Sequence, residues 1–366
     1  MKSFCRGVLR FAGMMVLLCP LSSWAATVSW DGGAGGNNNW SGNNNWDPDG
    51  DPAAGSDLIM TGSVKLTNTV NNVGGTAGSY NSITFGSGAS GTFLIGGGIL
   101  TNGAGGIVNN NTNLQMFTNE LIVMSAAQTW NAASGNLGIS SAITNGGNLL
   151  TIDGANNTTL GGKITGTGGL TKNGAGVLSL TGAVANTYSG VTTINAGQIT
   201  LQKTAGVDAI AGNITINTGG TLLLGASDQV ISTADMTLAG GTFKTGGFDE
   251  TLDTLTLTAN SVIDMTGAGD ILHFSDSSAI AWTGGTTLEI QGYDGATDQL
   301  FFGATDSGVT AGQLTQISFR DPVGWSPGSY SAFIQSDGRV IPIPEPATIL
   351  SGFLLFGILV RHGRRH

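Results

Sequence analysis

The chain has 366 residues, of which 61 are Gly, 40% are hydrophobic and only 10% are charged. So many apolar residues exclude a disordered chain, and so much Gly excludes a protein built mainly of helices. The formal net charge is −10 at pH 7, although six of the 13 Lys and Arg residues lie in the first ten and last six positions. We therefore expect an acidic body that repels anionic membrane surfaces and has no nucleic-acid partner.

The N-terminal segment, residues 1–25, predicts an export signal. Three basic residues come first, residues 11–21 form an apolar run that is too short to span a bilayer, and small side chains precede a cleavage point between Ala25 and Ala26. Signal peptidase is therefore an expected partner. Both cysteines lie within residues 1–25, so the mature chain is expected to contain no disulfide bond.

Residues 26–57 predict a cap at the N-terminal end of the fold. Trp30, Trp40 and Trp46 lie among Gly and Asn residues, which are poor helix formers and favour turns. The three indoles would cover the open end of a repetitive fold, where the core and unpaired strand edges are exposed. The alternative is that the indole faces stay exposed and stack on sugars.

The densest group of carboxylates follows this Trp-rich run. Counted from Asp47, the helix-loop-helix calcium motif requires Gly at its sixth position and Glu at its twelfth, where this chain has Pro52 and Leu58. The motif therefore fails, and a solvated loop is expected. An irregular calcium site stays open at Asp47, Asp49 and Asp51.

Short alternating runs recur through the centre of the chain. Leu178 and Leu180 alternate with Ser and Thr, as expected of a strand with one buried face. A fixed period of about 21 residues with no helical stretch between the strands is typical of a solenoid. Four apolar residues share that spacing and are predicted to stack in one inward column: Leu180, Leu201, Leu222 and Phe243.

The stretch 168–203 carries a longer and more specific pattern. Its motif positions are Gly168, Gly169, Leu170, Thr171, Lys172, Gly174, Gly176, Leu178, Leu180, Gly182, Asn186, Thr187, Tyr188, Ser189, Gly190, Thr192, Ile194, Asn195 and Gly197. These residues resemble the autotransporter-associated β-strand repeat. The resemblance implies a right-handed parallel β-helix, as in secreted passenger domains, and implies no chemistry. Weaker echoes occur at residues 146–152, 219–224 and 240–245.

The all-β body is expected to span residues 58–290, with stacked Asn or Thr ladders at its corners. Residues 291–343 predict a C-terminal cap. Thr310 and Gln313 have the spacing of a capping box, which predicts a short helical turn. The two arginines of the body are expected to form salt bridges with nearby carboxylates, in the pairs Arg320–Asp321 and Arg339–Asp337.

Residues 344–366 carry a second specific pattern. Pro344, Glu345 and Pro346 precede an apolar run at 347–360, which is followed by Arg361, Arg364 and Arg365. The pattern resembles the PEP-CTERM sorting signal of Gram-negative bacteria, which implies processing by an exosortase-type membrane protease. Fourteen residues of helix rise only about 21 Å, short of the ~30 Å hydrocarbon core, so a transient inner-membrane tether is expected. The alternative is a permanent single-span anchor.

The chain offers little for catalysis. His273 is the only histidine between residues 26 and 343, and the Asp residues of the repeats are scattered, so we expect no catalytic residue, no metal and no cofactor. The expected function is a non-enzymatic structural protein of the cell surface or extracellular matrix, with extracellular polysaccharide as a candidate partner. The alternatives are an adhesin or glycan-binding module and, in second place, a polysaccharide lyase or hydrolase. Burial of five indoles would argue against a binder: Trp30, Trp40, Trp46, Trp130 and Trp282.

Overall fold

The computed structural model describes residues 8–11, 14–17, 26–33, 35–66, 69–72, 78–267 and 269–344. Most of the predicted processing residues lie outside these ranges, namely Ala25, Glu345, Pro346, Arg361, Arg364 and Arg365. The predicted membrane helix at 347–360 lies outside them as well. Within the described ranges, no helix is both long enough and apolar enough to cross a membrane. Near the N-terminus, β1 (Val8–Phe11) pairs antiparallel with β2 (Met14–Leu17).

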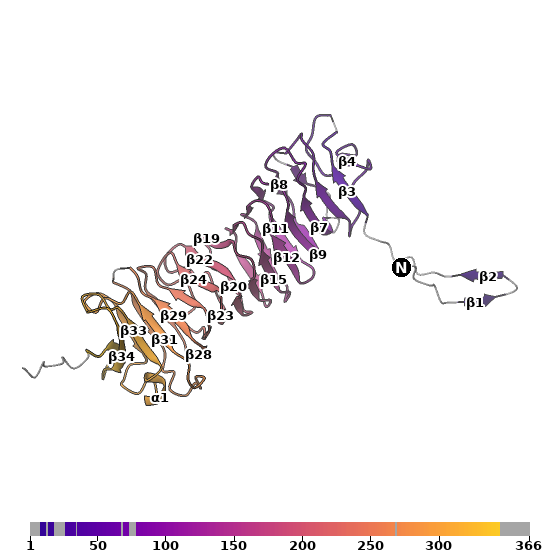
Figure 1. The fold of residues 1–366 in the computed structure, drawn as a ribbon. Coiled ribbons are helices and arrows are strands. Elements are labelled where there is room, and N and C mark those ends of the chain that lie inside the picture. Colours follow the sequence, from indigo (N-terminus) through magenta and orange to yellow (C-terminus); the bar gives the residue numbers. More distant parts are fainter. Residues whose placement is uncertain are drawn as a thin grey trace, which may run out of the picture.

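The body is an all-β solenoid of about ten coils, which extends from the N-terminal to the C-terminal end in Figure 1. Its strands belong to three parallel ladders, so each coil stacks on the coil before it. The strands are short because Gly- and Asn-rich corners interrupt them and turn the chain. The predicted all-β parallel β-helix is therefore confirmed.

The first ladder runs from β6 to the C-terminal end. It contains β6 (Thr69–Asn71), β8 (Leu94–Gly97), β10 (Gln115–Phe117), β13 (Leu137–Ile139), β16 (Thr158–Leu160), β19 (Val177–Gly182), β22 (Gly197–Lys203), β24 (Gly220–Leu224), β26 (Thr242–Lys244), β29 (Ser261–Asp264), β31 (Leu288–Gln291) and β33 (Ile317–Arg320).

The second ladder is interrupted. It contains β11 (Leu121–Met124), β14 (Ala142–Thr144), β17 (Ile164–Gly166) and β20 (Thr187–Tyr188), and it resumes with β27 (Glu250–Leu252), β30 (Ile271–Phe274) and β32 (Gln299–Phe302). Between the two parts, a single parallel bridge joins Ile210 to Val230.

The third ladder begins at the N-terminal end of the body. It contains β3 (Thr27–Trp30), β5 (Asp57–Met60), β7 (Ser79–Phe85), β9 (Leu100–Asn109), β12 (Gln128–Asn131), β15 (Leu150–Asp153), β18 (Leu170–Lys172), β21 (Thr192–Ile194), β23 (Ile214–Asn217), β25 (Met236–Ala239) and β28 (Leu255–Ala259). The long strand β9 serves two ladders, because its first part pairs with β11 and its last part with β12.

The register of the first ladder corrects the predicted column. Leu180 lies opposite Leu201, as expected, but Leu201 lies opposite Leu224. Leu222 instead belongs to the neighbouring column, where it pairs with Phe243. The coil between β22 and β24 is longer than the predicted period, and this extra length shifts the pairing by two positions. Since side chains alternate with a period of two, such a shift keeps all of them inside, and each is fully buried.

Three indoles fill the interior at the N-terminal end of the body. Trp46, on β4 (Trp46–Asp47), meets Trp30 edge to face with ring centroids 5.1 Å apart and Trp40 at 5.6 Å. Its Nε1 donates a hydrogen bond to the carbonyl oxygen of Trp40 (2.9 Å). All three side chains are fully buried. The residues that the sequence places in an N-terminal cap thus form an aromatic cluster.

An antiparallel hairpin covers strand edges at the C-terminal end. β34 (Ser329–Ile334) pairs with β33 of the first ladder, and β35 (Arg339–Pro342) pairs with β32 of the second. The two hairpin strands also pair with each other. The last strands of two ladders therefore do not end as open edges.

The short helix α1 (Ala311–Leu314) confirms the predicted capping box. The backbone N–H of Gln313 donates to the Thr310 hydroxyl, and the Gln313 side chain accepts from the backbone N–H of Thr310. Of the two predicted arginine salt bridges, one is confirmed and one is wrong. The Nε atom of Arg320 lies 3.6 Å from the Oδ2 atom of Asp321, as expected. The pairing of Arg339 with Asp337 is wrong, because the Arg339 guanidinium turns toward a corner of the solenoid and donates to carbonyl oxygens there.

Candidate functional site

The glycines of the repeat allow the coils to touch backbone to backbone. A Cβ atom added to Gly176 would lie 1.9 Å from the carbonyl oxygen of Asn156, and one added to Gly168 would lie 1.9 Å from that of Asn148. Such distances leave no room for any side chain. A Cβ atom added to Gly169, Gly174 or Gly190 would likewise lie less than 3.0 Å from a backbone atom of a neighbouring coil. Gly197 also requires a positive φ of +66°.

The polar residues of the repeat form hydrogen bonds both between neighbouring coils and within one coil. The carboxamide oxygen of Asn186 accepts from the backbone N–H of Ile164 (2.9 Å), and its nitrogen donates to the carbonyl oxygen of Ala209 (2.7 Å). Tyr188 is fully buried, and its hydroxyl lies 2.7 Å from the hydroxyl of Thr192. Burial raises the pKa of Tyr188, which keeps the phenol neutral. These residues satisfy buried polar groups that the stacked corners would otherwise leave unpaired.

The inward column of the third ladder contains a buried lysine. Lys172 lies between Ile152 and Ile194 in register, and its ammonium donates to the carbonyl oxygen of Gly174. Burial lowers the pKa of Lys172, and the nearby Asp153 opposes that shift. Leu170, Leu178 and Leu180, the apolar residues of the same repeat, are also buried. The predicted repeat residues are therefore brought together by stacking, and they do not converge on a pocket.

The outer side of the third ladder is a regular polar surface, which we call the Thr–Asn face. One Thr from each of seven consecutive coils lies in register, namely Thr129, Thr151, Thr171, Thr193, Thr215, Thr237 and Thr256. Neighbouring strands of a sheet are about 4.8 Å apart, so the hydroxyls and methyls recur at that spacing. Beside them, the side-chain nitrogen of Asn195 donates to the Asn173 side chain and that of Asn217 to Asn195, each at 2.7 Å. The Asn residues confirm the stacking predicted at the corners, whereas the Thr residues stack within the strands.

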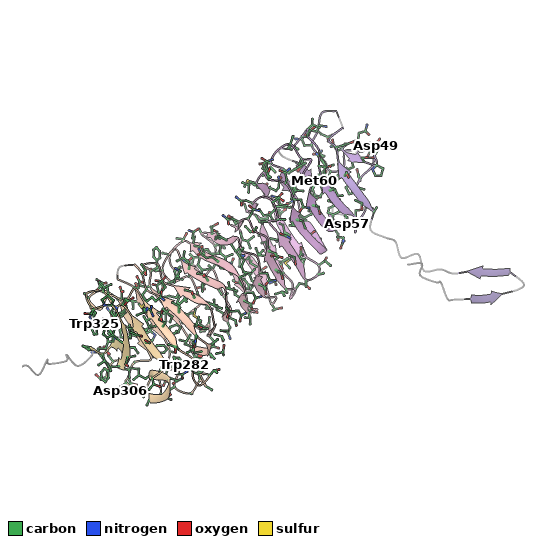
Figure 2. The ribbon with its side chains drawn as sticks, viewed as in Figure 1. Asp49, Asp57, Met60, Trp282, Asp306 and Trp325 are labelled. Atoms are coloured by element: carbon green, nitrogen blue, oxygen red, sulfur yellow. The ribbon has the colours of Figure 1, made fainter. Side chains whose placement is uncertain are left out.

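The predicted indoles do not offer an open binding surface. Trp30, Trp40, Trp46 and Trp130 are fully buried. Trp282 is partly buried, and its Nε1 donates to the carbonyl oxygen of Leu255 (2.8 Å). The result argues against a binder that uses these residues. Figure 2 shows Trp282 together with Trp325 at the C-terminal end, and Trp325 was not among the predicted residues.

The carboxylates of the repeats are engaged in local interactions. Asp264 forms an ion pair with Lys244 (2.8 Å), and Asp270 is buried with a hydrogen bond from Thr245. Among the described residues, no group of three or more His, Cys, Asp or Glu side chains is placed to hold a metal ion. His273 is half-buried on β30, with its ring 5.7 Å from that of Phe301. The candidate calcium ligands Asp47, Asp49 and Asp51 are exposed.

Two predicted processing residues fall within the described ranges, one at each end of the body. Ala26 is exposed, and its carbonyl oxygen accepts from the backbone N–H of Asp57 (2.9 Å). Pro344 is exposed just beyond β35.

A family model named the passenger-associated transport repeat matches residues 170–202. The match covers about a tenth of the chain and spans the strands from β18 to β22, where the glycine contacts and the Asn186 and Tyr188 bonds occur. Comparison with curated proteins found no match, and comparison with solved structures found none either. The repeat and the solenoid fit a secreted, passenger-like protein of a structural or adhesin type.

Proposed function

We propose that this chain is a non-enzymatic structural protein that a Gram-negative bacterium exports to its surface or extracellular matrix. The proposal rests on the contacts that the repeat residues make between stacked coils. The glycines and Asn186 are engaged in stacking one coil upon the next, and Tyr188 is buried within its own coil. A chain built in this way forms a long scaffold with a continuous apolar core, and it separates its two ends.

The surface of the scaffold supports this role. The Thr–Asn face carries mostly neutral side chains that hydrogen-bond to water or to one another, and it extends over seven coils. We infer that the aromatic cluster around Trp46 and the C-terminal hairpin act as the two caps. Both cover parts of the solenoid that would otherwise pair with other chains.

The export route is the second part of the proposal. Signal peptidase would cleave between Ala25 and Ala26, and an exosortase-type protease would process the segment around Pro344, Glu345 and Pro346. The passenger-type repeat supports export in general. The proline-rich triplet favours extended backbone, which a protease can bind as a strand. We infer that the inner membrane holds the chain transiently before release.

Replacing Pro344, Glu345 and Pro346 together with Ala tests the route. The triple variant is expected to remain unprocessed in the inner-membrane fraction with Arg364 and Arg365 still attached. Mass spectrometry of the C-terminal peptide in each cell fraction provides the readout. A triple variant that reached the surface with the C-terminus of the native protein would show that the triplet is not the sorting signal.

The absence of catalysis is tested separately. Purified protein incubated with common polysaccharides is expected to release neither reducing ends nor unsaturated sugars. If release occurred, and if Asp153→Asn or Asp235→Asn abolished it, the lyase or hydrolase alternative would replace the structural one. These two carboxylates are chosen because they lie on the outer side of the third ladder or at its corner, where a polysaccharide could reach them.

A further inference from the structure

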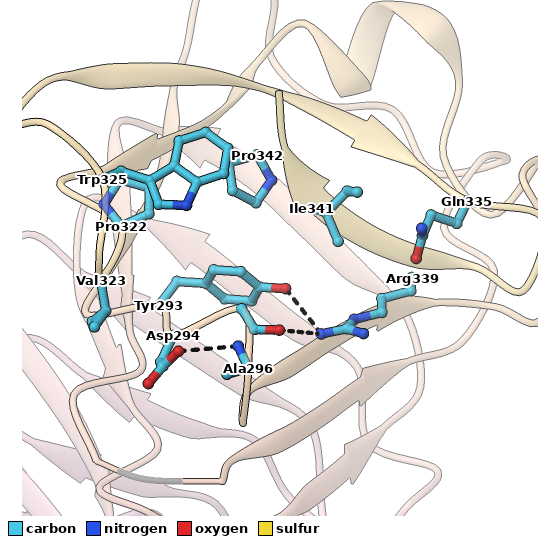
Figure 3. A pocket seen from close by; sticks show the side chains of 11 residues that line it. Tyr293, Asp294, Ala296, Pro322, Val323, Trp325, Gln335, Arg339, Ile341 and Pro342 are labelled. Carbon is cyan, nitrogen blue, oxygen red and sulfur yellow. Dashed lines mark hydrogen bonds between the residues drawn. The ribbon is translucent and has the colours of Figure 1, made fainter. Parts of the chain in front are cut away.

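The C-terminal part of the molecule carries a pocket of about 430 Å³. Three segments that lie far apart in the sequence form it: the corner after β31 at residues 293–296, the loop after β33 at residues 322–325, and the hairpin at residues 335–342 (Figure 3). Its volume lies within the range of about 300 to 1,000 Å³ that is usual for small-ligand sites. Nothing in the Thr–Asn face or in the repeat contributes to it.

One end of the pocket is aromatic and is held in place by its neighbours. Trp325 is 37% exposed, and its indole meets the Tyr330 ring edge to face at 5.0 Å and 85°. The Tyr330 hydroxyl in turn donates to the carbonyl oxygen of Ser326 (2.6 Å). The Tyr293 ring is buried, at 4.8 Å from the Phe319 ring. The exposed indole is therefore braced before any ligand arrives, which reduces the entropy lost on binding.

The other end of the pocket is polar. One terminal nitrogen of Arg339 donates to the Tyr293 hydroxyl (3.4 Å) and to the carbonyl oxygens of Gly295 (3.2 Å) and Asp298 (2.9 Å). The Nε atom of Arg339 is buried and has no hydrogen-bond partner among the described residues. The guanidinium is thus held in one position at this end of the pocket.

Two further polar side chains line the same space. One carboxylate oxygen of Asp294 accepts from the backbone N–H of Ala296 (3.0 Å), and Figure 3 shows the other oxygen without a partner among the residues drawn. Gln335 lies near Arg339 and adds an amide donor and acceptor. The pocket thus offers both donors and acceptors opposite an aromatic face.

The geometry points to a neutral saccharide as the ligand, and we propose that this pocket binds the end of such a chain. The C–H face of a sugar ring is apolar and packs on an indole, while its hydroxyls both donate and accept hydrogen bonds. An anionic sugar is disfavoured, because the Asp294 carboxylate repels it and the Arg339 guanidinium is already surrounded by three acceptor oxygens. This proposal goes beyond the scaffold role and is independent of it, since a scaffold needs no pocket.

The test titrates the purified protein with neutral hexasaccharides of β-1,4-glucose, α-1,4-glucose, β-1,4-xylose and N-acetylated β-1,4-glucosamine. Isothermal titration calorimetry measures binding, and Trp fluorescence reports on the indole. At least one neutral probe is expected to bind with a Kd of about 1 mM or below. Hexagalacturonate, the anionic comparator, is expected to bind at least about tenfold more weakly.

Substitutions of lining residues test whether the saccharide binds in this pocket. Trp325→Ala is expected to weaken binding at least about tenfold, and Gln335→Ala severalfold, while Trp325→Phe retains part of the affinity. Leu149→Ala, which trims an exposed apolar side chain in the central coils, is the control and should bind like the native protein. Circular dichroism checks that each variant is folded. The proposal is overturned if no neutral probe binds at about 5 mM, if Trp325→Ala binds unchanged, or if hexagalacturonate binds more tightly.

Discussion

The central coils, residues 137–260, and the C-terminal end, residues 261–344, both stack on the first and second ladders, whereas the third ladder ends with β28. In the centre, partners across the first ladder follow one another closely in the sequence, as Leu178 and Ile199 do. At the C-terminal end the coils are longer, because Ile263 pairs with Ile290 and Ile290 pairs with Phe319. The extra residues form loops outside the stacked strands.

The difference shows that coil length determines whether a side chain packs between coils or lines a surface pocket. In the short central coils, Gly residues let the backbones of neighbouring coils touch, Asn186 bonds across coils, and Tyr188 is buried within its own coil. In the longer coils, loops carry Trp325, Asp294 and other side chains away from the stack, and these line a pocket. Every ion pair found among the described residues also lies between residues 244 and 321. We infer that the centre of the molecule serves as a scaffold and that its C-terminal end carries the pocket and the Arg320 ion pairs.

The largest effect is expected from a methyl group placed between two central coils. Gly176→Ala would put its Cβ 1.9 Å from a backbone oxygen, and backbone atoms cannot move aside independently. We expect a loss of about 3 to 5 kcal/mol in the free energy of unfolding, measured by urea denaturation. Gly284→Ala is the matched control at the C-terminal end, where nothing lies within 4 Å of the added atom, and it should change stability by less than about 0.5 kcal/mol. Equal losses at both sites would remove the distinction between the two regions.

A neighbouring pair of leucines tests which face of β24 points inward. Leu222 is fully buried, whereas Leu223 points to the outer side of β24 and is only partly buried. Leu222→Ala is expected to cost about 3 kcal/mol of unfolding free energy, because it leaves a cavity beside Ile199 and Phe243. Leu223→Ala should cost less than about 1 kcal/mol. Thermal unfolding of the two variants gives the comparison, and a larger loss for Leu223→Ala would contradict the inward direction of Leu222.

A buried carboxylate near the boundary between the regions predicts a pH effect. Burial raises the pKa of Glu250 to about 8, although the backbone N–H groups of Gln229, Val230 and Thr251 donate to its oxygens and oppose the shift. Between the unfolded value near 4.5 and about 8, the unfolded chain is ionised there and the folded chain is not. The free energy of unfolding should therefore fall, by about 4 kcal/mol, as the pH rises from about 4.5 to about 8.

Glu250→Gln should flatten this dependence, whatever its effect on stability at a single pH. Asp306→Asn, which changes an exposed carboxylate of the C-terminal end, serves as the control and should leave the slope intact. Urea denaturation at pH 5, 6.5 and 8 measures the slope for each protein. A native protein whose stability rose over this range would show that Glu250 is ionised in the fold.

The smallest effect is expected on the Thr–Asn face. Asn195→Ala removes the central member of the exposed Asn ladder and with it the bonds to Asn173 and Asn217. Exposed hydrogen bonds contribute little, so the loss should be about 1 kcal/mol. Thermal unfolding measures it, with Thr193→Val on the same coil as a nearly isosteric comparison. A loss as large as that of Gly176→Ala would mean that the Asn ladder, and not backbone contact, holds the central coils together.

The repeating part of the fold could be predicted from the sequence because its rules are local. Alternation around Leu178 and Leu180 indicates a half-buried strand, and recurrence at a fixed period indicates a solenoid. The capping box at Thr310 and Gln313 is equally local. The column from Leu201 to Leu222 could not be predicted, because extra residues in a corner change the pairing without changing the inward direction of either side chain.

The C-terminal pocket depends on contacts between segments that lie far apart in the sequence, so no local spacing of residues predicts it. Arg339 bonds to a corner that lies much earlier in the chain, so the nearby Asp337 was the wrong partner to infer. Trp325 lies in a loop without a periodic pattern, and only the fold brings it close to Tyr293. The exposed aromatic residue was thus missed, while the conspicuous cluster of Trp residues near the N-terminus is buried.

Fractionation of the native host tests the claim that this chain is an exported scaffold. The native host is separated into cytoplasm, inner membrane, outer membrane and extracellular material, and mass spectrometry identifies both ends of the chain in each fraction. We predict a surface or extracellular protein that begins at Ala26 and has lost Arg361 and the residues after it. A chain that kept both these residues and residues 1–25, and that stayed in the cytoplasm or inner membrane, would contradict the claim.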